Sequence, residues 1–123
     1  MKHNPVGWFE IYVQDMARAK EFYEGVLQQK LEKLNSPELE MWSFPMEMGG
    51  WGAGGALVKM EGCPSGGNST LIYFICDDCA TEEGRITQSG GRIHRSKMSI
   101  GEYGFISLAY DTEGNMFGLH SMK

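Results

Sequence analysis

A carboxylate between two aromatic residues is the first feature of the chain that could do chemistry. Residues 8–13 read WFEIYV, and successive side chains of a β-strand point to opposite faces of the sheet. One face then carries the apolar side chains Phe9, Ile11 and Val13. The other, mixed face carries Trp8, Glu10 and Tyr12. In an apolar pocket the pKa of a carboxyl group can rise to a value suited to proton abstraction, so Glu10 is a candidate general base.

Two cysteines form a second candidate group. Cys76-Asp77-Asp78-Cys79 is a C-x-x-C motif where a predicted strand meets a predicted helix, a position at which redox-active dithiols occur. The two aspartates disfavour a thiolate, however, and Cys76 should lie on the helix-packed face of its strand. A structural role and thiol-dependent regulation therefore both remain open. Cys63, in a glycine-rich segment, is expected to be exposed.

Further aromatic side chains could line a cavity for a small organic molecule. In the strongly β-prone stretch TLIYFIC, Tyr73 should share a face with Leu71 and Ile75. Trp51 lies in a glycine-rich run and is expected to act as a lid over a ligand. The strand face of Trp42 is not fixed by the sequence, so core packing and cavity lining are both open for it.

Composition and charge exclude several classes of function. The chain has 123 residues, 41% of them hydrophobic, which suits one globular domain. Its net charge of −5 argues against binding to nucleic acid or an anionic membrane, because both need concentrated Lys and Arg. No stretch approaches the roughly 20 apolar residues of a membrane span, and no signal peptide is apparent, so a cytoplasmic protein is expected.

The elements needed to position these residues occur twice in the same order. Residues 1–60 are predicted to form a strand, a helix and three strands, at 8–13, 16–27, 29–34, 38–46 and 55–60. Residues 61–69, rich in glycine and serine, are a predicted linker. Residues 70–123 repeat the order, with strands at 70–76, 92–95, 104–110 and 115–121. Asp15 and Asp78 are N-cap candidates of the two helices, and the whole chain is predicted to be one α+β domain of two modules.

Residues at the start of the first module and at the end of the second resemble a known family. The first junction reads Tyr12-Val13-Gln14-Asp15 with Phe22-Tyr23 after it, and the chain closes with DTEGN followed by Phe117-Gly118-Leu119. This pattern resembles the vicinal oxygen chelate superfamily, which includes glyoxalase I, extradiol dioxygenases, fosfomycin-resistance transferases and bleomycin-binding proteins. The resemblance covers nearly the whole chain and does not single out one member.

The resemblance implies a fold and an assembly. It implies two βαβββ modules, each a curved mixed sheet with its helix on the convex side and a ligand cleft on the concave side. The mixed face of Trp8, Glu10 and Tyr12 would then line the cleft. The resemblance also implies a homodimer, because family chains of this length usually pair their modules between subunits.

Enzymes of this family bind a divalent metal through side chains of the first and last strand of each module. Carried over to this chain, the ligand positions fall on residues whose side chains cannot coordinate a metal: Trp8, Leu71, Gly118 and either Gly54 or Gly55. The usual metal is therefore not expected. As an alternative, Glu10 and His120 lie on the same strand faces as Trp8 and Gly118, and with a third ligand they could rebuild a site for Zn²⁺, Ni²⁺ or Fe²⁺. Otherwise Glu10 accepts hydrogen bonds and His120 caps a strand end.

Together these observations predict a protein that binds a small organic molecule in an aromatic-lined cleft without the usual catalytic metal. The expected ligand-binding residues are Trp8, Glu10, Tyr12, Trp51, Tyr73 and His120. The alternative is a glyoxalase-like lyase or isomerase in which Glu10 is the general base, with or without a rebuilt metal site. A third hypothesis is a thiol-dependent regulator that acts through Cys76 and Cys79.

Overall fold

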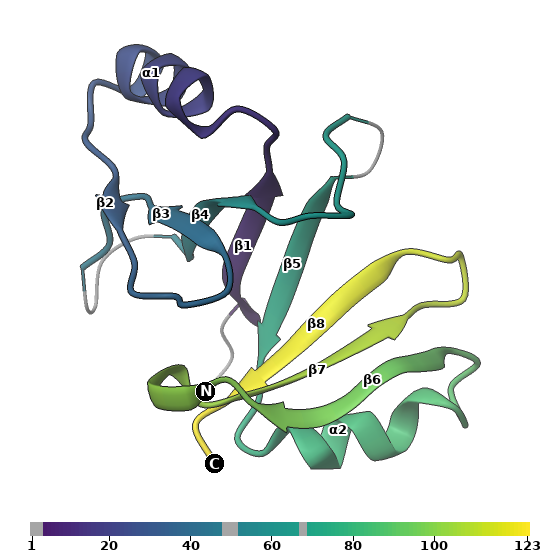
Figure 1. Ribbon diagram of the computed structural model, residues 1–123. Helices are drawn as coiled ribbons and strands as arrows, with labels where there is room; N and C mark the ends of the chain where they lie inside the picture. The colour runs from purple at the N-terminus through teal and green to yellow at the C-terminus, as the bar shows by residue number, and fades with distance from the viewer. Residues whose placement is uncertain (1–3, 48–51, 67–68) are drawn as a thin grey trace. The chain divides into compact units, whose positions relative to one another are not determined.

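The computed structural model describes residues 4–47, 52–66 and 69–123, and Trp51, the predicted lid residue, lies outside them. The chain forms two compact units. The first unit comprises Trp8–Thr70, and the second comprises Met1–Gly7 together with Leu71–Lys123. Within the described residues, each unit contains four principal strands and one α-helix in the order β-α-β-β-β (Figure 1). The predicted α+β class with two βαβββ modules is thus confirmed.

The first unit is a mixed four-stranded sheet covered by one helix. Its elements are β1 (Val6–Tyr12), α1 (Met16–Leu27), β2 (Glu32–Lys33), β3 (Glu40–Ser43) and β4 (Gly54–Lys59), and β1 begins with two residues of the second unit. The strand order is β2-β3-β4-β1. Strand β3 pairs antiparallel with both β2 and β4, whereas β1 runs parallel to β4, so the first and last strands of the module lie next to each other.

The second unit repeats this topology. Its elements are β5 (Thr70–Ile75), α2 (Cys79–Ile86), β6 (Arg92–Ser99), the short 3₁₀ helix η1 (Gly101–Tyr103), β7 (Phe105–Tyr110) and β8 (Met116–Ser121). The strand order is β5-β8-β7-β6, with β5 parallel to β8. No α-helix of the described residues is long and apolar enough to cross a membrane.

Both helices start where the sequence predicts. The side chain of Asp15 accepts a hydrogen bond from the backbone N–H of Arg18 at 3.1 Å, and Asp78 does the same for Ala80 at 3.0 Å. Each cap satisfies one of the N–H groups that the first turn of a helix leaves without a partner. The strand-to-aspartate-to-helix junction is therefore the same local structure in both units.

The core of the first unit lies between α1 and the apolar face of its sheet. Val13, Met16, Leu31 and Leu57 are buried there, with Ile11, Trp42 and Phe44 packed against them. Trp42 thus packs on the helix face, where the Lys20 ammonium lies 3.3 Å from the centre of its ring. Of the two roles left open for Trp42, the structure shows core packing, and its side chain is directed away from the mixed face of β1.

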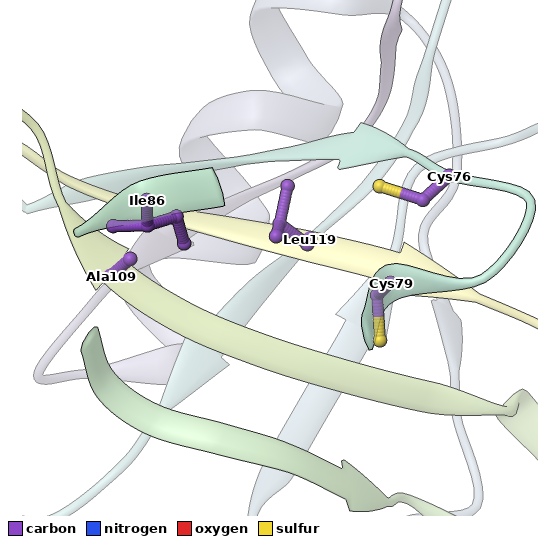
Figure 2. Close-up of a cluster of buried hydrophobic side chains, with 5 residues drawn as sticks. All are labelled: Cys76, Cys79, Ile86, Ala109 and Leu119. Carbon is purple, nitrogen blue, oxygen red and sulfur yellow. The ribbon is translucent and has the colours of Figure 1, made fainter. Parts of the chain in front are cut away.

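The core of the second unit has the same position relative to its helix. Cys76, Cys79, Ile86, Ala109 and Leu119 form a buried cluster, and Figure 2 shows Leu119 of β8 between Ile86 of α2 and Cys76. The helix lies along β6, β7 and β8 (Figure 1). The predicted position of Cys76 on the helix-packed face is confirmed.

Several strand lengths differ from the prediction. The strands expected at residues 29–34 and 38–46 are β2 and β3, of two and four residues. The turn at Asn35-Ser36-Pro37 and Pro45 beyond β3 limit backbone pairing on both sides, because proline has no N–H to donate. By contrast β6 runs four residues beyond Arg95, to Ser99, with irregular register on both sides of Arg95.

Two glycines provide a matched test of this packing. Gly25 is exposed in α1 with nothing within 4 Å of an added Cβ, so Gly25→Ala should raise the free energy of unfolding by about 1 kcal/mol. At buried Gly55 in β4 a Cβ would overlap the ring of Phe9, so Gly55→Ala should lower the free energy of unfolding by roughly 1–3 kcal/mol. Urea denaturation of both variants measures the difference. A Gly55→Ala protein as stable as the parent would contradict the placement of Phe9.

Candidate functional site

The mixed face of β1 carries a hydrogen-bonded group of three side chains. The Glu10 carboxylate accepts a hydrogen bond from the Trp8 indole N–H to Oε2 at 3.1 Å. It accepts a second from the Tyr12 hydroxyl to Oε1 at 2.6 Å. Because the three residues are two apart along one strand, the alternation of side chains places the donors on either side of the carboxylate. One donor reaches each oxygen, which fixes the orientation of the carboxylate.

Small residues on β4 make room for these side chains. In the parallel register Trp8 lies opposite Gly54 and Glu10 opposite Ala56. A Cβ added at Gly54 would lie 3.2 Å from two atoms of the Trp8 ring, so the indole lies over the glycine backbone. In the sequence, Gly54 stands out only as a position at which family enzymes carry a metal-binding side chain and this chain does not. Its role in seating Trp8 could have been found only from the register of β1 against β4.

The predicted linker holds the end of this group in place. The backbone N–H of Tyr12 donates to the carbonyl of Ser69 at 3.0 Å, and the Ser65 hydroxyl donates to the carbonyl of Tyr12 at 2.9 Å. The Gln14 side-chain amide donates to the Cys63 carbonyl at 3.0 Å. The segment after β4 therefore folds back along the end of β1 and fixes the backbone from which the Tyr12 hydroxyl reaches Glu10.

Glu10 is buried, with 8% of its surface exposed. Burial raises the pKa of its carboxyl group, while the hydrogen bonds from Tyr12 and Trp8 lower it, and the net pKa is above the ordinary value. Among the described residues no lysine or arginine forms an ion pair with Glu10. Two neutral donors are therefore what stabilises the ionised form in place of bulk water.

This arrangement defines what the face can do chemically. Each oxygen of an ionised carboxylate has more than one lone pair, so Glu10 can still accept a donor from a ligand after binding Trp8 and Tyr12. The half-buried indole and phenol rings supply apolar contact area on either side. A carboxylate with a raised pKa in such surroundings can also accept a proton at neutral pH.

The other predicted ligand-binding residues belong to the second unit. Tyr73 of β5 is buried and lies over Gly118 of β8, where an added Cβ would overlap its ring. His120 is two residues further along β8, and its Nε2 donates to the carbonyl of Tyr103 in η1 at 2.6 Å. The ring of His120 thus anchors η1 to the sheet, close to the strand-end role considered for it from the sequence. Its partner could not be foreseen, because η1 has no clear signal in the sequence.

The residues at the family's metal positions do not fit a metal ion. Trp8, Leu71, Gly54 and Gly118 have no side-chain atom that binds a divalent cation. Of the two alternative ligands, Glu10 belongs to the first unit and His120 to the second, and each is hydrogen-bonded within its own unit. Among the described residues, no group of three or more His, Cys, Asp or Glu side chains is arranged around a common point. The side chains at these positions therefore provide no ligand set for a divalent cation.

The two cysteines of the C-x-x-C motif have structural surroundings. Cys76 and Cys79 are free thiols buried in the core of the second unit (Figure 2). Burial, followed by the negative charge of Glu82, raises the pKa of Cys76 to about 11, so this residue is a thiol at neutral pH. The backbone N–H of Cys79 donates to the Ser121 hydroxyl at 3.0 Å. These contacts favour packing over thiol chemistry. Cys63 is partly buried rather than fully exposed.

Comparisons with known proteins place this fold among solved relatives. The model of the Glyoxalase/Bleomycin resistance protein/Dioxygenase superfamily matches residues 6–119. A Streptomyces coelicolor methylmalonyl-CoA epimerase in complex with 2-nitronate-propionyl-CoA has a TM-score of 0.72 at 15% identity, covering 95% of this chain and 96% of that chain. The methylmalonyl-CoA epimerase from Mycobacterium tuberculosis has a TM-score of 0.72 at 15% identity, covering 97% and 88%.

A hypothetical protein from Bacillus halodurans C-125 is also similar, with a TM-score of 0.75 at 12% identity, covering 99% of this chain and 96% of that chain. No curated protein sequence matches the chain. At these identities the solved structures establish the shared fold.

The raised pKa of Glu10 predicts a pH dependence of stability. Above the ordinary glutamate pKa of 4.5 the folded protein holds the Glu10 proton more tightly than the unfolded chain does. The contribution of Glu10 to the free energy of unfolding should therefore fall as pH rises from that value to the folded-state pKa, and stay constant above it. Relative to Glu10→Gln, the wild-type protein should lose stability across this window.

Urea denaturation at several pH values measures this difference. Glu21→Gln, which removes an exposed carboxylate from α1, controls for the loss of one negative charge. A wild-type protein that gains stability relative to Glu10→Gln as pH rises through this window would show that the Glu10 pKa is lowered, contrary to its buried position.

Proposed function

Because the chain belongs to the Glyoxalase/Bleomycin resistance protein/Dioxygenase superfamily, we propose that it binds a small organic molecule on the mixed face of β1. The observation that supports this most directly is the Glu10 carboxylate, held by Trp8 and Tyr12 and buried without a cation. Small-molecule sites typically combine apolar and aromatic walls with a few fixed polar groups. In this proposal the rings supply the walls and Glu10 fixes the orientation of the ligand.

The chemistry of Glu10 defines the ligand class. An ionised carboxylate only accepts hydrogen bonds, so the group that meets it must donate one, as a hydroxyl, an amide or an acidic C–H next to a carbonyl does. We expect the ligand to bind without a divalent metal at the metal positions of the family, because the side chains there have no metal-coordinating atoms. Trp51 remains a proposed lid residue, and Tyr73 and His120 remain proposed ligand-binding residues of the second unit. A homodimer is part of the proposal on the strength of the family resemblance alone.

A second candidate is catalysis of proton transfer, as in a lyase or isomerase. The raised pKa of Glu10 favours it, because a base is most effective when its pKa approaches the working pH. In such a step the carboxylate takes a proton from a carbon next to a carbonyl, and the C–H electron pair becomes part of an enolate. Return of that proton from Glu10 to a neighbouring atom of the enolate completes an isomerisation.

Ligand binding can be tested with a matched pair of carboxylates. Glu40 accepts an indole N–H from Trp42 at 3.1 Å, the same distance and sequence spacing as Glu10 and Trp8, but Trp42 lies on the helix face. A fragment library and methylmalonyl-CoA are screened by ligand-observed NMR, and dissociation constants of the hits are measured by calorimetry. Glu10→Gln should weaken hits that carry a hydrogen-bond donor about tenfold, the equivalent of about 1.4 kcal/mol, whereas Glu40→Gln should not.

Two outcomes of this screen decide between the candidates. Hits whose affinity is the same in Glu10→Gln and in the wild-type protein would exclude Glu10 from the site. Exchange of the acidic C–H of a hit in D₂O, catalysed by the wild-type protein and slowed at least a hundredfold in Glu10→Gln, would favour the enzyme. Binding without such exchange would favour the binding protein.

A further inference from the structure

Basic side chains gather on β6, the edge strand of the second unit (Figure 1). Residues 92–97 read RIHRSK, so four of six residues are basic. Ile93 packs against the buried cluster beneath α2. Because side chains alternate along a strand, Arg92 and His94 point to the other side of the sheet, away from α2.

An irregular register adds Arg95 to the same side. Ile93 pairs with Ala109, and two residues later Arg95 pairs with Leu108, so β6 has one residue more than β7 over this stretch. In a regular strand Arg95 would point towards α2, as Ile93 does. The extra residue reverses it, because paired residues share a face and Leu108 points away from Ala109. The exposed basic residues on this side, called the basic cluster below, are Arg92, His94 and Arg95.

The fourth basic residue of β6, Lys97, is used by the fold. Its ammonium lies 2.8 Å from the carboxylate of Asp78, the N-cap of α2, and 4.8 Å from the centre of the Phe105 ring. Phe105 packs against the cluster beneath α2, so Lys97 points to the helix side. By contrast, neither Arg92 nor Arg95 forms an ion pair with any of the described residues.

The sheet itself supplies no counter-charge for the basic cluster. Strands β5 to β8 contain no aspartate or glutamate. The carboxylate that follows β7, Asp111, accepts hydrogen bonds from the backbone N–H groups of Glu113 and Asn115 and from the Asn115 side chain, and so serves the turn. Like charges on one face repel each other. No carboxylate of the sheet offsets this repulsion, whereas a bound anion would.

Tyr110 gives the basic cluster an aromatic wall. The Arg92 Cζ lies 4.4 Å from the centre of the Tyr110 ring, and the His94 ring meets the same ring edge-on, with 5.5 Å between the centres. A guanidinium over an aromatic face still has its N–H donors available in its own plane. The Arg95 guanidinium lies 3.9 Å from the Met98 sulfur, which is a weak acceptor that a stronger one can replace.

We propose that the basic cluster binds the phosphate group of a small organic phosphate monoester. Such a group carries roughly −1.5 to −2 charges at pH 7 and has three strong acceptor oxygens. Two guanidinium groups match that charge and can each donate two parallel hydrogen bonds, and the His94 imidazole adds another donor. The organic part of the ligand contacts the Tyr110 ring. This binding is non-covalent and concerns the second unit, whereas Glu10 belongs to the first.

The test uses phenyl phosphate as the probe. Phenyl sulfate has the same shape with one negative charge, and inorganic phosphate lacks the ring. Binding is followed through the ¹H–¹⁵N signals of the arginine Nε–H groups, at constant ionic strength because salt screens exposed charges. Phenyl phosphate should shift the Arg92 and Arg95 signals saturably. Phenyl sulfate and inorganic phosphate should each bind at least fivefold more weakly.

Three variants connect this binding to the basic cluster. Arg92→Gln and Arg95→Gln should each reduce the affinity for phenyl phosphate at least tenfold. Arg85→Gln is the matched control, since it removes the same charge from an exposed position of the same unit, on α2. Its affinity should stay within twofold of the wild-type value. The thermal midpoints of the three variants show that they are folded.

Other outcomes would overturn the proposal. It fails if phenyl phosphate causes no saturable shift, or if Arg85→Gln weakens binding as much as Arg95→Gln, which would indicate attraction by overall charge. Equal affinity for phenyl sulfate would contradict the match to a doubly charged group. Equal affinity for inorganic phosphate would contradict an organic ester as the ligand. Because these signals belong to the second unit, none of these results bears on the function proposed for Glu10.

Discussion

The hydrogen bonds from Trp8 and Tyr12 to Glu10 are the interaction on which the rest of the first unit depends. A carboxylate that is largely withdrawn from water needs compensation, and in this protein two neutral donors supply it without a cation. The donors can reach it only if all three side chains point to one face of the strand. The parallel pairing with β4, Gly54 under the indole and the segment around Ser65 that holds the Tyr12 backbone keep these side chains in position.

The two faces of β1 carry different kinds of side chain. The apolar face packs against α1 and contributes to the core, while the mixed face contains polar groups that a core would not normally keep. In the second unit the strand position that corresponds to Glu10 carries Tyr73, whose ring packs over Gly118. The two modules share a topology, but only the first places a carboxylate at this position. At this strand position the first unit thus carries a buried carboxylate and the second a packed aromatic ring.

Much of this was predictable from the sequence because it depends on local rules. Side-chain alternation placed Trp8, Glu10 and Tyr12 on one face, and the aspartate caps marked both helix starts. Features that depend on contacts between distant segments were not predictable. The face of Trp42 and the partner of His120 each follow from strand register or the placement of distant segments, which the periodicity of the sequence does not contain.

The measurement that tests the central claim most directly is the ¹³C titration of the Glu10 side-chain carboxyl group by NMR, in the wild-type protein and in Tyr12→Phe. The burial of Glu10 predicts a pKa above 4.5 in the wild-type protein. A further rise is expected in Tyr12→Phe, because the lost hydrogen bond favoured the ionised form. A pKa at or below 4.5, or one that Tyr12→Phe leaves unchanged, would contradict the claim that Glu10 is a buried carboxylate stabilised by its two aromatic neighbours.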